Sequence, residues 1–180
     1  MMDTRPALAP EGAASKAFLR FWRGLVEGFG RVPHRADIRP EDMLEIIDHV
    51  WLYERDGEDF RCRIMGNHVQ PRWGRPVIGQ CFAELMPKDR AALLAGRLMG
   101  ALANSHVGHG FNDVSKSDRY AERVYGPLLD AAGRPVFVLG VSSYVERKLT
   151  VQGSPGSIPL GVTNFYDALS LEYRETVRDE

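Results

Sequence analysis

Two histidines three residues apart, His106 and His109, are the first candidates for chemistry in this sequence. On a helix, that spacing would place both imidazoles on one face, where they could share a metal ion with Asp113. One well-placed histidine could also be the axial ligand of a haem. However, Gly108 and Gly110 favour a strand or loop, in which residues three apart point to opposite faces. No cluster of cysteines or glutamates completes a coordination shell, so we predict no metal site and leave any cofactor unknown.

The sequence contains two cysteines, Cys62 and Cys81. Two cysteines are too few for a disulfide framework, and we expect both to be reduced. Alternation in residues 59–65 places Cys62 on the buried side of a strand, and we interpret both cysteines as small core residues. Residues 1–10 lack the basic and then apolar order of a signal peptide, so we expect a cytoplasmic protein.

Acid–base chemistry has three candidates, Asp113, Glu122 and Tyr125. They would serve a small, cone-shaped α+β enzyme, which stays open as an alternative function. The sequence has no phosphate loop, nucleophile elbow or H-E-x-x-H motif. The alternating Arg119 and Arg123 are typical of a solvated sheet face rather than of an active site. We therefore predict no catalytic residue and a non-enzymatic protein.

The composition excludes several other classes of protein. The chain has 180 residues, of which 44% are hydrophobic and 26% are charged, as expected for one globular domain. Its net charge of -1, from 23 basic and 24 acidic residues, argues against nucleic-acid binding, which needs a surplus of basic side chains. The longest apolar stretches, such as residues 135–141, are far shorter than the ~20 residues that span a membrane.

A helix is predicted near the N-terminus, after a flexible segment at 1–12. Apolar side chains recur there at helical spacing, and the helix is expected over residues 13–30. Its wide aromatic face must be covered by something, and we predict that it forms a homodimer interface through Phe18, Trp22, Leu25 and Phe29.

Five strands and a second helix are predicted in the middle of the chain. Asp56-Gly57 is a strong hairpin signal between the first two strands, and Pro87 favours a helix over 88–103. The strands are expected at residues 50–55, 59–65, 106–114, 119–129 and 135–145. The last of them is apolar on both faces, which predicts a central strand or one covered by a helix or a partner chain. The fold class is therefore α+β, with five antiparallel strands and helices on one face.

The end of the chain, residues 148–180, is predicted to be a linker and a possible helix. Glycine, serine and proline dominate residues 153–161. A terminal helix over 165–177 would align Phe165, Leu169, Tyr173 and Val177.

This order of elements resembles that of a PAS domain, and residues 22–145 resemble a small bacterial PAS family. The matching stretches are Trp22-Arg23, VPHRAD at 32–37, RCRIMG at 61–66, WGRPVIG at 73–79 and ERVYGPLLDAAG at 122–133, the last with Pro127-Leu128 where the family carries that pair. The resemblance places the domain itself at 31–147. It implies a sensory or interaction module. Because few residues follow Val145, we expect the signalling effector to be a separate protein, or the domain to act by binding alone.

The resemblance also implies a ligand pocket of unknown occupant. The candidate lining side chains are Trp73, Leu94, Leu98, Phe111, Tyr125 and Tyr144. Such sites are mostly apolar with a few polar groups. The alternative is that these side chains fill the core and leave no cavity, which would favour a purely structural interaction module. We expect the partners to be a second copy of the chain, an effector protein and a small molecule, with no nucleic acid and no membrane.

Overall fold

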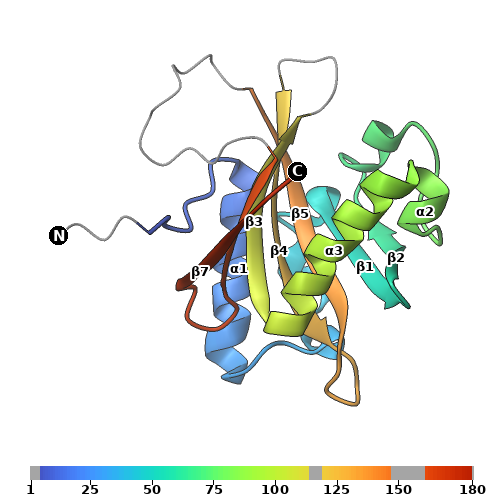
Figure 1. The fold of residues 1–180 in the computed structure, drawn as a ribbon. Helices are drawn as coiled ribbons and strands as arrows, with labels where there is room; N and C mark the ends of the chain where they lie inside the picture. Colours follow the sequence, from blue (N-terminus) through green and yellow to red (C-terminus); the bar gives the residue numbers. More distant parts are fainter. Residues whose placement is uncertain (1–4, 114–118, 147–160, 180) are drawn as a thin grey trace.

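The computed structural model describes residues 5–113, 119–146 and 161–179, which form one antiparallel sheet with helices on both faces (Figure 1). The strand order is β2-β1-β5-β4-β3-β6-β7. The strands are β1 (Val50–Asp56), β2 (Asp59–Met65), β3 (His106–Asp113), β4 (Arg119–Leu129), β5 (Pro135–Glu146), β6 (Val162–Asp167) and β7 (Tyr173–Arg178). The helices are α1 (Ala13–Phe29), α2 (Phe82–Leu85) and α3 (Lys88–Asn104), with short 3₁₀ turns between some of the elements.

The helices predicted at 13–30 and 88–103 and the five strands predicted in the middle of the chain are present. The helix α1 ends at Gly30, whose φ of 64° is the left-handed conformation that commonly terminates helices. Gly57 has the same φ in the turn between β1 and β2, where the hairpin was predicted. The strand β5 lies between β1 and β4 and is covered on both faces, which accounts for its continuous apolar sequence.

The sheet has seven strands rather than five, and the predicted C-terminal helix is wrong. Residues 162–178 instead form a hairpin, β6–β7, that pairs with β3 through β6. Leu171, at a φ of 57°, lies in the turn region that follows β6, where a continuous helix would need the opposite sign. The linker predicted around residues 153–160 lies outside the described residues, as do residues 1–4 of the predicted flexible segment.

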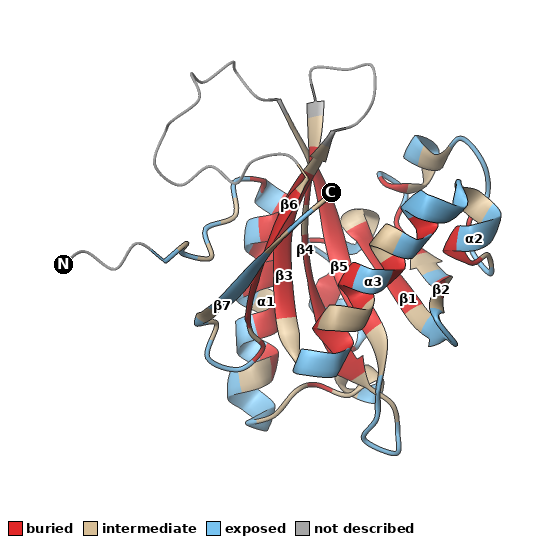
Figure 2. Ribbon diagram, in the orientation of Figure 1, coloured by how far each residue is buried: buried red, intermediate tan, exposed pale blue. Residues whose placement is uncertain are grey.

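Two apolar cores lie on the two faces of the sheet. The core on the α3 face includes Trp51, Tyr53, Phe82 and Leu98, and the core on the α1 face includes Phe18 and Trp22 among others. Figure 2 shows that burial is greatest along the central strands, while β7 is largely exposed. No helix in the described part of the chain combines the length and apolar character that crossing a membrane requires.

Candidate functional site

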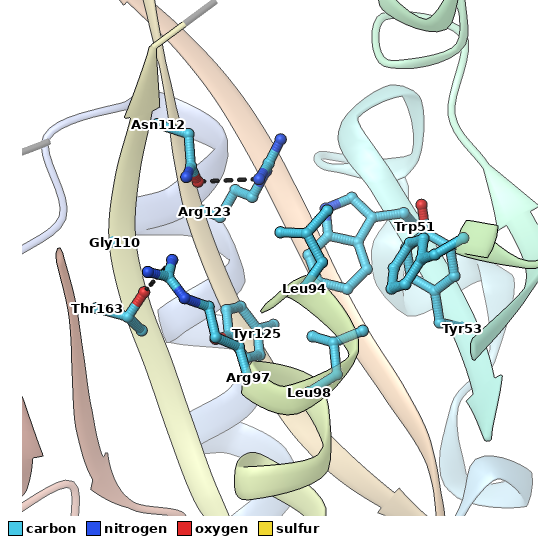
Figure 3. A pocket seen from close by; sticks show the side chains of 11 residues that line it. Trp51, Tyr53, Leu94, Arg97, Leu98, Gly110, Asn112, Arg123, Tyr125 and Thr163 are labelled. Atoms are coloured by element: carbon cyan, nitrogen blue, oxygen red, sulfur yellow. Dashed lines mark hydrogen bonds between the residues drawn. The ribbon is translucent and has the colours of Figure 1, made fainter. Parts of the chain in front are cut away.

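A cavity of about 60 Å³, partly open to solvent, lies between α3 and the sheet. Figure 3 shows the side chains around it, which come from α2, α3 and the four strands β1, β3, β4 and β6. They are Trp51, Tyr53, Phe82, Leu94, Arg97, Leu98, Gly110, Asn112, Arg123, Tyr125 and Thr163. The set is mainly apolar with a few polar groups, which is the usual composition of a small-molecule site.

Glycines in the strands beneath the cavity make room for its aromatic wall. A Cβ at Gly108 would collide with the ring of Tyr125, and one at Gly140 would collide with both Trp51 and Tyr125. These rings therefore lie close against the backbone of β3 and β5. Glycine within a strand often marks such a close approach.

One side of the cavity is aromatic and aliphatic. The ring centroids of Trp51 and Tyr125 are 5.7 Å apart, and those of Tyr53 and Phe82 are 4.8 Å apart. The indole Nε1 of Trp51 donates to Oγ of Ser142 at 3.1 Å, which fixes the orientation of the ring. Leu94 and Leu98 of α3 complete this side.

The other side of the cavity carries two arginines with different partners (Figure 3). Arg97 of α3 donates to Oγ1 of Thr163 at 2.9 Å and to the carbonyl of Gly161 at 3.2 Å, and it forms an ion pair with Asp179. Arg123 of β4 donates to the amide oxygen of Asn112 at 2.9 Å. Among the described residues, no carboxylate pairs with Arg123.

Burial changes the proton affinity of several lining groups. It lowers the pKa of Arg123, because removing a guanidinium from water disfavours its charge. It raises the pKa of Tyr125 to about 12 and also raises that of Tyr53. Both phenols are therefore neutral near pH 7 and act as hydrogen-bonding groups.

The strand order of the sheet and a comparison of the sequence with family models identify the same family. Without the β6–β7 hairpin, the strand order is β2-β1-β5-β4-β3, with α2 and α3 between β2 and β3. Residues 11–142 match a family model described as PAS domain. The chain belongs to the PAS domain family. PAS domains are in general sensory or regulatory modules. No curated protein matches the chain.

Three of the six side chains predicted for the PAS pocket line the cavity: Leu94, Leu98 and Tyr125. Trp73 is partly buried and packs against the same core without lining the cavity. Tyr144 stacks against Arg72, 4.5 Å from ring centroid to guanidinium carbon, beside a second and more open hollow.

Phe111, the remaining predicted lining residue, faces the other side of the sheet. It is buried with Val162, whereas Gly110 and Asn112 on either side of it line the cavity. Successive side chains of a strand point to opposite faces, so a strand that offers Asn112 to the cavity must turn Phe111 away.

The prediction missed the polar half of the cavity. Arg123 precedes Tyr125 by two residues, so strand alternation places both on one face and could have identified Arg123. The expectation that Arg123 belongs to a solvated face is wrong, because its guanidinium lies at the cavity beside Asn112. Arg97 and Thr163 had no comparable signal, since the strand β6 itself was not predicted.

The histidine pair does not form a joint site. His106 lies beside Phe165 on the α3 face, whereas His109 is buried and donates from Nε2 to Oε1 of Glu122 at 2.7 Å. The described residues contain no group of three potential metal ligands. The side chain of Asp113, the third candidate ligand, lies outside the described part. Cys62 and Cys81 are buried and free, as predicted.

Glu122, a candidate acid–base residue, instead holds the start of α1. Its carboxylate accepts hydrogen bonds from the backbone N–H groups of Glu11 at 2.8 Å and Gly12 at 2.7 Å. Burial alone would raise the pKa of Glu122, but the hydrogen bonds from His109 and from these amides hold it below its usual value. The carboxylate is buried beneath α1, away from the cavity.

Three of the four side chains predicted for a dimer interface lie inside the chain's own core. Phe18 and Trp22 have no exposed surface and Leu25 is 8% exposed, because α1 packs its apolar face on β4 and β5. The face that needed a cover is therefore covered within one chain. Phe29, at the end of α1, is 47% exposed.

Proposed function

We propose that this PAS domain is a non-enzymatic sensor that binds a small molecule in the cavity between α3 and the sheet. The observation that carries the proposal is the composition of that cavity, with an apolar wall opposite two arginines. Its volume of about 60 Å³ is well below the ~300–1,000 Å³ of sites for drug-sized ligands. The ligand is therefore small, or its entry moves lining side chains.

The β6–β7 hairpin is the proposed output of the sensor. Arg97 lines the cavity and also contacts Thr163, Gly161 and Asp179, which belong to the hairpin or flank it. A ligand that moves Arg97 would therefore change the contacts between α3 and this hairpin. The ligand then shifts the population between two packings of the C-terminal segment.

A signalling effector in a separate chain, and a second copy of this chain, are the proposed protein partners. With Phe18 and Trp22 buried, either partner would contact exposed elements. The large exposed apolar side chains of the described residues are Phe29, Leu44, Ile47, Ile78 and Leu169. We place the protein in the cytoplasm, which agrees with two cysteines that are free.

Native mass spectrometry of protein purified from cells tests the ligand proposal, with an absorbance spectrum of the same sample to identify any chromophore. We expect an additional small mass that is lost on denaturation. Leu98→Trp fills the cavity and should abolish it, whereas Leu44→Trp, at a side chain that is 71% exposed, is the matched control and should retain it. The proposal would be contradicted if the wild type, Leu98→Trp and Leu44→Trp all lacked an additional mass. It would also be contradicted if Leu98→Trp kept the additional mass.

A further inference from the structure

We propose that the ligand of this cavity is a small monocarboxylate with an apolar body, recognised by Arg123. The inference rests on the proposed function, because it specifies the ligand class for the same cavity. It follows from the partners of the two cavity arginines, from the apolar wall opposite them and from the small volume.

The charge of the cavity favours an anion. Arg97 has an acidic partner in Asp179, whereas Arg123 has only the amide oxygen of Asn112 among the described residues. Within the part of the chain that the structure describes, the other ionisable groups that act on Arg123 are Tyr53, Tyr125, Tyr144 and Arg90, none of which is an acid that is ionised near pH 7. Arg123 is half-buried, and a cation withdrawn from water without a counter-charge is unfavourable. A bound anion offsets part of that cost.

The geometry of a guanidinium specifies the kind of anion. Its planar fork of N–H groups matches a carboxylate, which can accept two parallel hydrogen bonds. One acceptor, Asn112, already occupies Nη1 of Arg123 and holds the group toward the cavity. Of the two arginines that line the cavity, Arg97 has an acidic partner and Arg123 has none among the described residues, which predicts a ligand with a single negative charge.

The remaining lining predicts the rest of the ligand. Opposite the arginines lie Trp51, Tyr53, Phe82, Leu94 and Leu98, which offer contact to a short aliphatic chain or a single ring. The phenols of Tyr53 and Tyr125 are neutral near pH 7 and therefore add no negative charge that would compete with a bound carboxylate. The volume of about 60 Å³ excludes large acyl chains unless the cavity widens.

Matched pairs of acids and their primary amides test the inference: acetate with acetamide, butyrate with butyramide, and benzoate with benzamide. Each pair differs in charge and hardly in shape. Titration calorimetry on the wild-type protein should give a Kd for at least one acid that is about tenfold or more below that of its amide, because a charged hydrogen-bonded pair is lost in the amide. Arg123→Gln should remove this preference, and Arg20→Gln, an exposed arginine on α1, should leave it unchanged.

The wild-type comparison decides the inference even if Arg123→Gln does not fold. Equal binding of acids and amides would overturn the monocarboxylate assignment and leave the ligand-binding function intact. Binding of neither series would also overturn the assignment, and the native mass measurement would then judge the proposed function separately. A preference for acids that persists in a folded Arg123→Gln protein would show that Arg123 is not the recognising residue.

Discussion

Arg97 on α3 and Thr163 on β6 are joined across the cavity by a hydrogen bond of 2.9 Å from guanidinium Nη1 to hydroxyl Oγ1. The two residues are far apart in sequence, and Arg97 is also the cavity residue that forms an ion pair with Asp179. The site that we assign to the ligand and the C-terminal hairpin therefore share one side chain. This contact is the structural basis for coupling between them.

Replacing Arg97 should loosen the hairpin selectively. Arg97→Gln removes the contacts with Thr163 and Asp179, and hydrogen exchange of the amides in β6 and β7 should become about tenfold faster or more, as expected for loss of a hydrogen bond to a charged group. Exchange in β1 and β2, at the other edge of the sheet, should not change. Arg20→Gln serves as the control, and a uniform increase over the whole sheet would contradict a local coupling.

Trp22 contacts the same hairpin from the α1 face of the sheet. Its indole Nε1 donates to the carbonyl of Ala168 at 2.8 Å, and its ring lies directly over Gly126. Trp22→Phe leaves that buried carbonyl without its donor and removes part of a core ring. We expect a loss of about 2–4 kcal/mol in the free energy of unfolding, measured by urea denaturation.

Light scattering on the Trp22→Phe protein separates this role from a role in dimerisation. A residue of the chain's own core should lower the stability and leave the mass in solution unchanged. A protein of wild-type stability whose mass falls by half would instead place Trp22 at an interface between two copies.

Glu122 predicts a defined pH dependence. Because its pKa in the folded protein lies below the usual value of 4.5, its stabilising effect is complete above about pH 4.5 and is lost as the pH falls through the lowered pKa. Glu122→Gln should reduce the free energy of unfolding at pH 7 by about 2–3 kcal/mol, since the carboxylate accepts two backbone hydrogen bonds at the start of α1.

Urea denaturation of the wild type and Glu122→Gln from pH 7 to pH 3 measures this effect. The difference between the two proteins should shrink as the medium becomes acidic, because the wild-type carboxyl group is then protonated. A difference that stays constant over that range would show that the loss of stability has another cause than the charge of Glu122.

The glycine beneath the aromatic wall offers a way to close the cavity without changing its lining. Gly140→Ala introduces a Cβ that collides with Trp51 and Tyr125, and it should destabilise the protein by about 1–3 kcal/mol and prevent ligand binding. The control is Gly96→Ala, at an exposed position of α3 where the added Cβ would have no neighbour within 4 Å. Its free energy of unfolding should rise by up to about 1 kcal/mol, because alanine favours a helix more than glycine does. Thermal unfolding and calorimetry measure the two effects, and unchanged binding by Gly140→Ala would contradict the assigned cavity.

Local periodicity predicts the elements whose apolar spacing admits one interpretation. The face of α1 repeats at intervals of three and four, which no strand can match, and the helix is found where it was predicted. Phe165, Leu169, Tyr173 and Val177 are spaced by four, and an even interval also returns to the same face of a strand. The segment was therefore ambiguous, and pairing of β6 with β3 decides in favour of strands.

The cavity could be predicted only in part for a related reason. The positions of Leu94, Leu98 and Tyr125 at the cavity could be predicted from the resemblance to a family. Arg97 is held at the cavity by its hydrogen bond to Thr163, and Thr163 lies on the strand β6, which was not predicted. The burial of Trp22 was equally hidden, because an amphipathic helix has the same pattern whether it covers its own sheet or a second chain.

The most direct test of the account is an NMR spectrum of the three tryptophan indole N–H groups as a filtered small-molecule extract of the expressing cells is added. Trp51 lines the cavity, whereas Trp22 lies on the opposite face of the sheet and contacts the hairpin through Ala168. The account predicts that the Trp51 signal shifts by more than the Trp22 signal, which responds to the ligand only through the hairpin. A Trp51 signal that does not move, or a Trp22 signal that shifts without it, would contradict a ligand in this cavity.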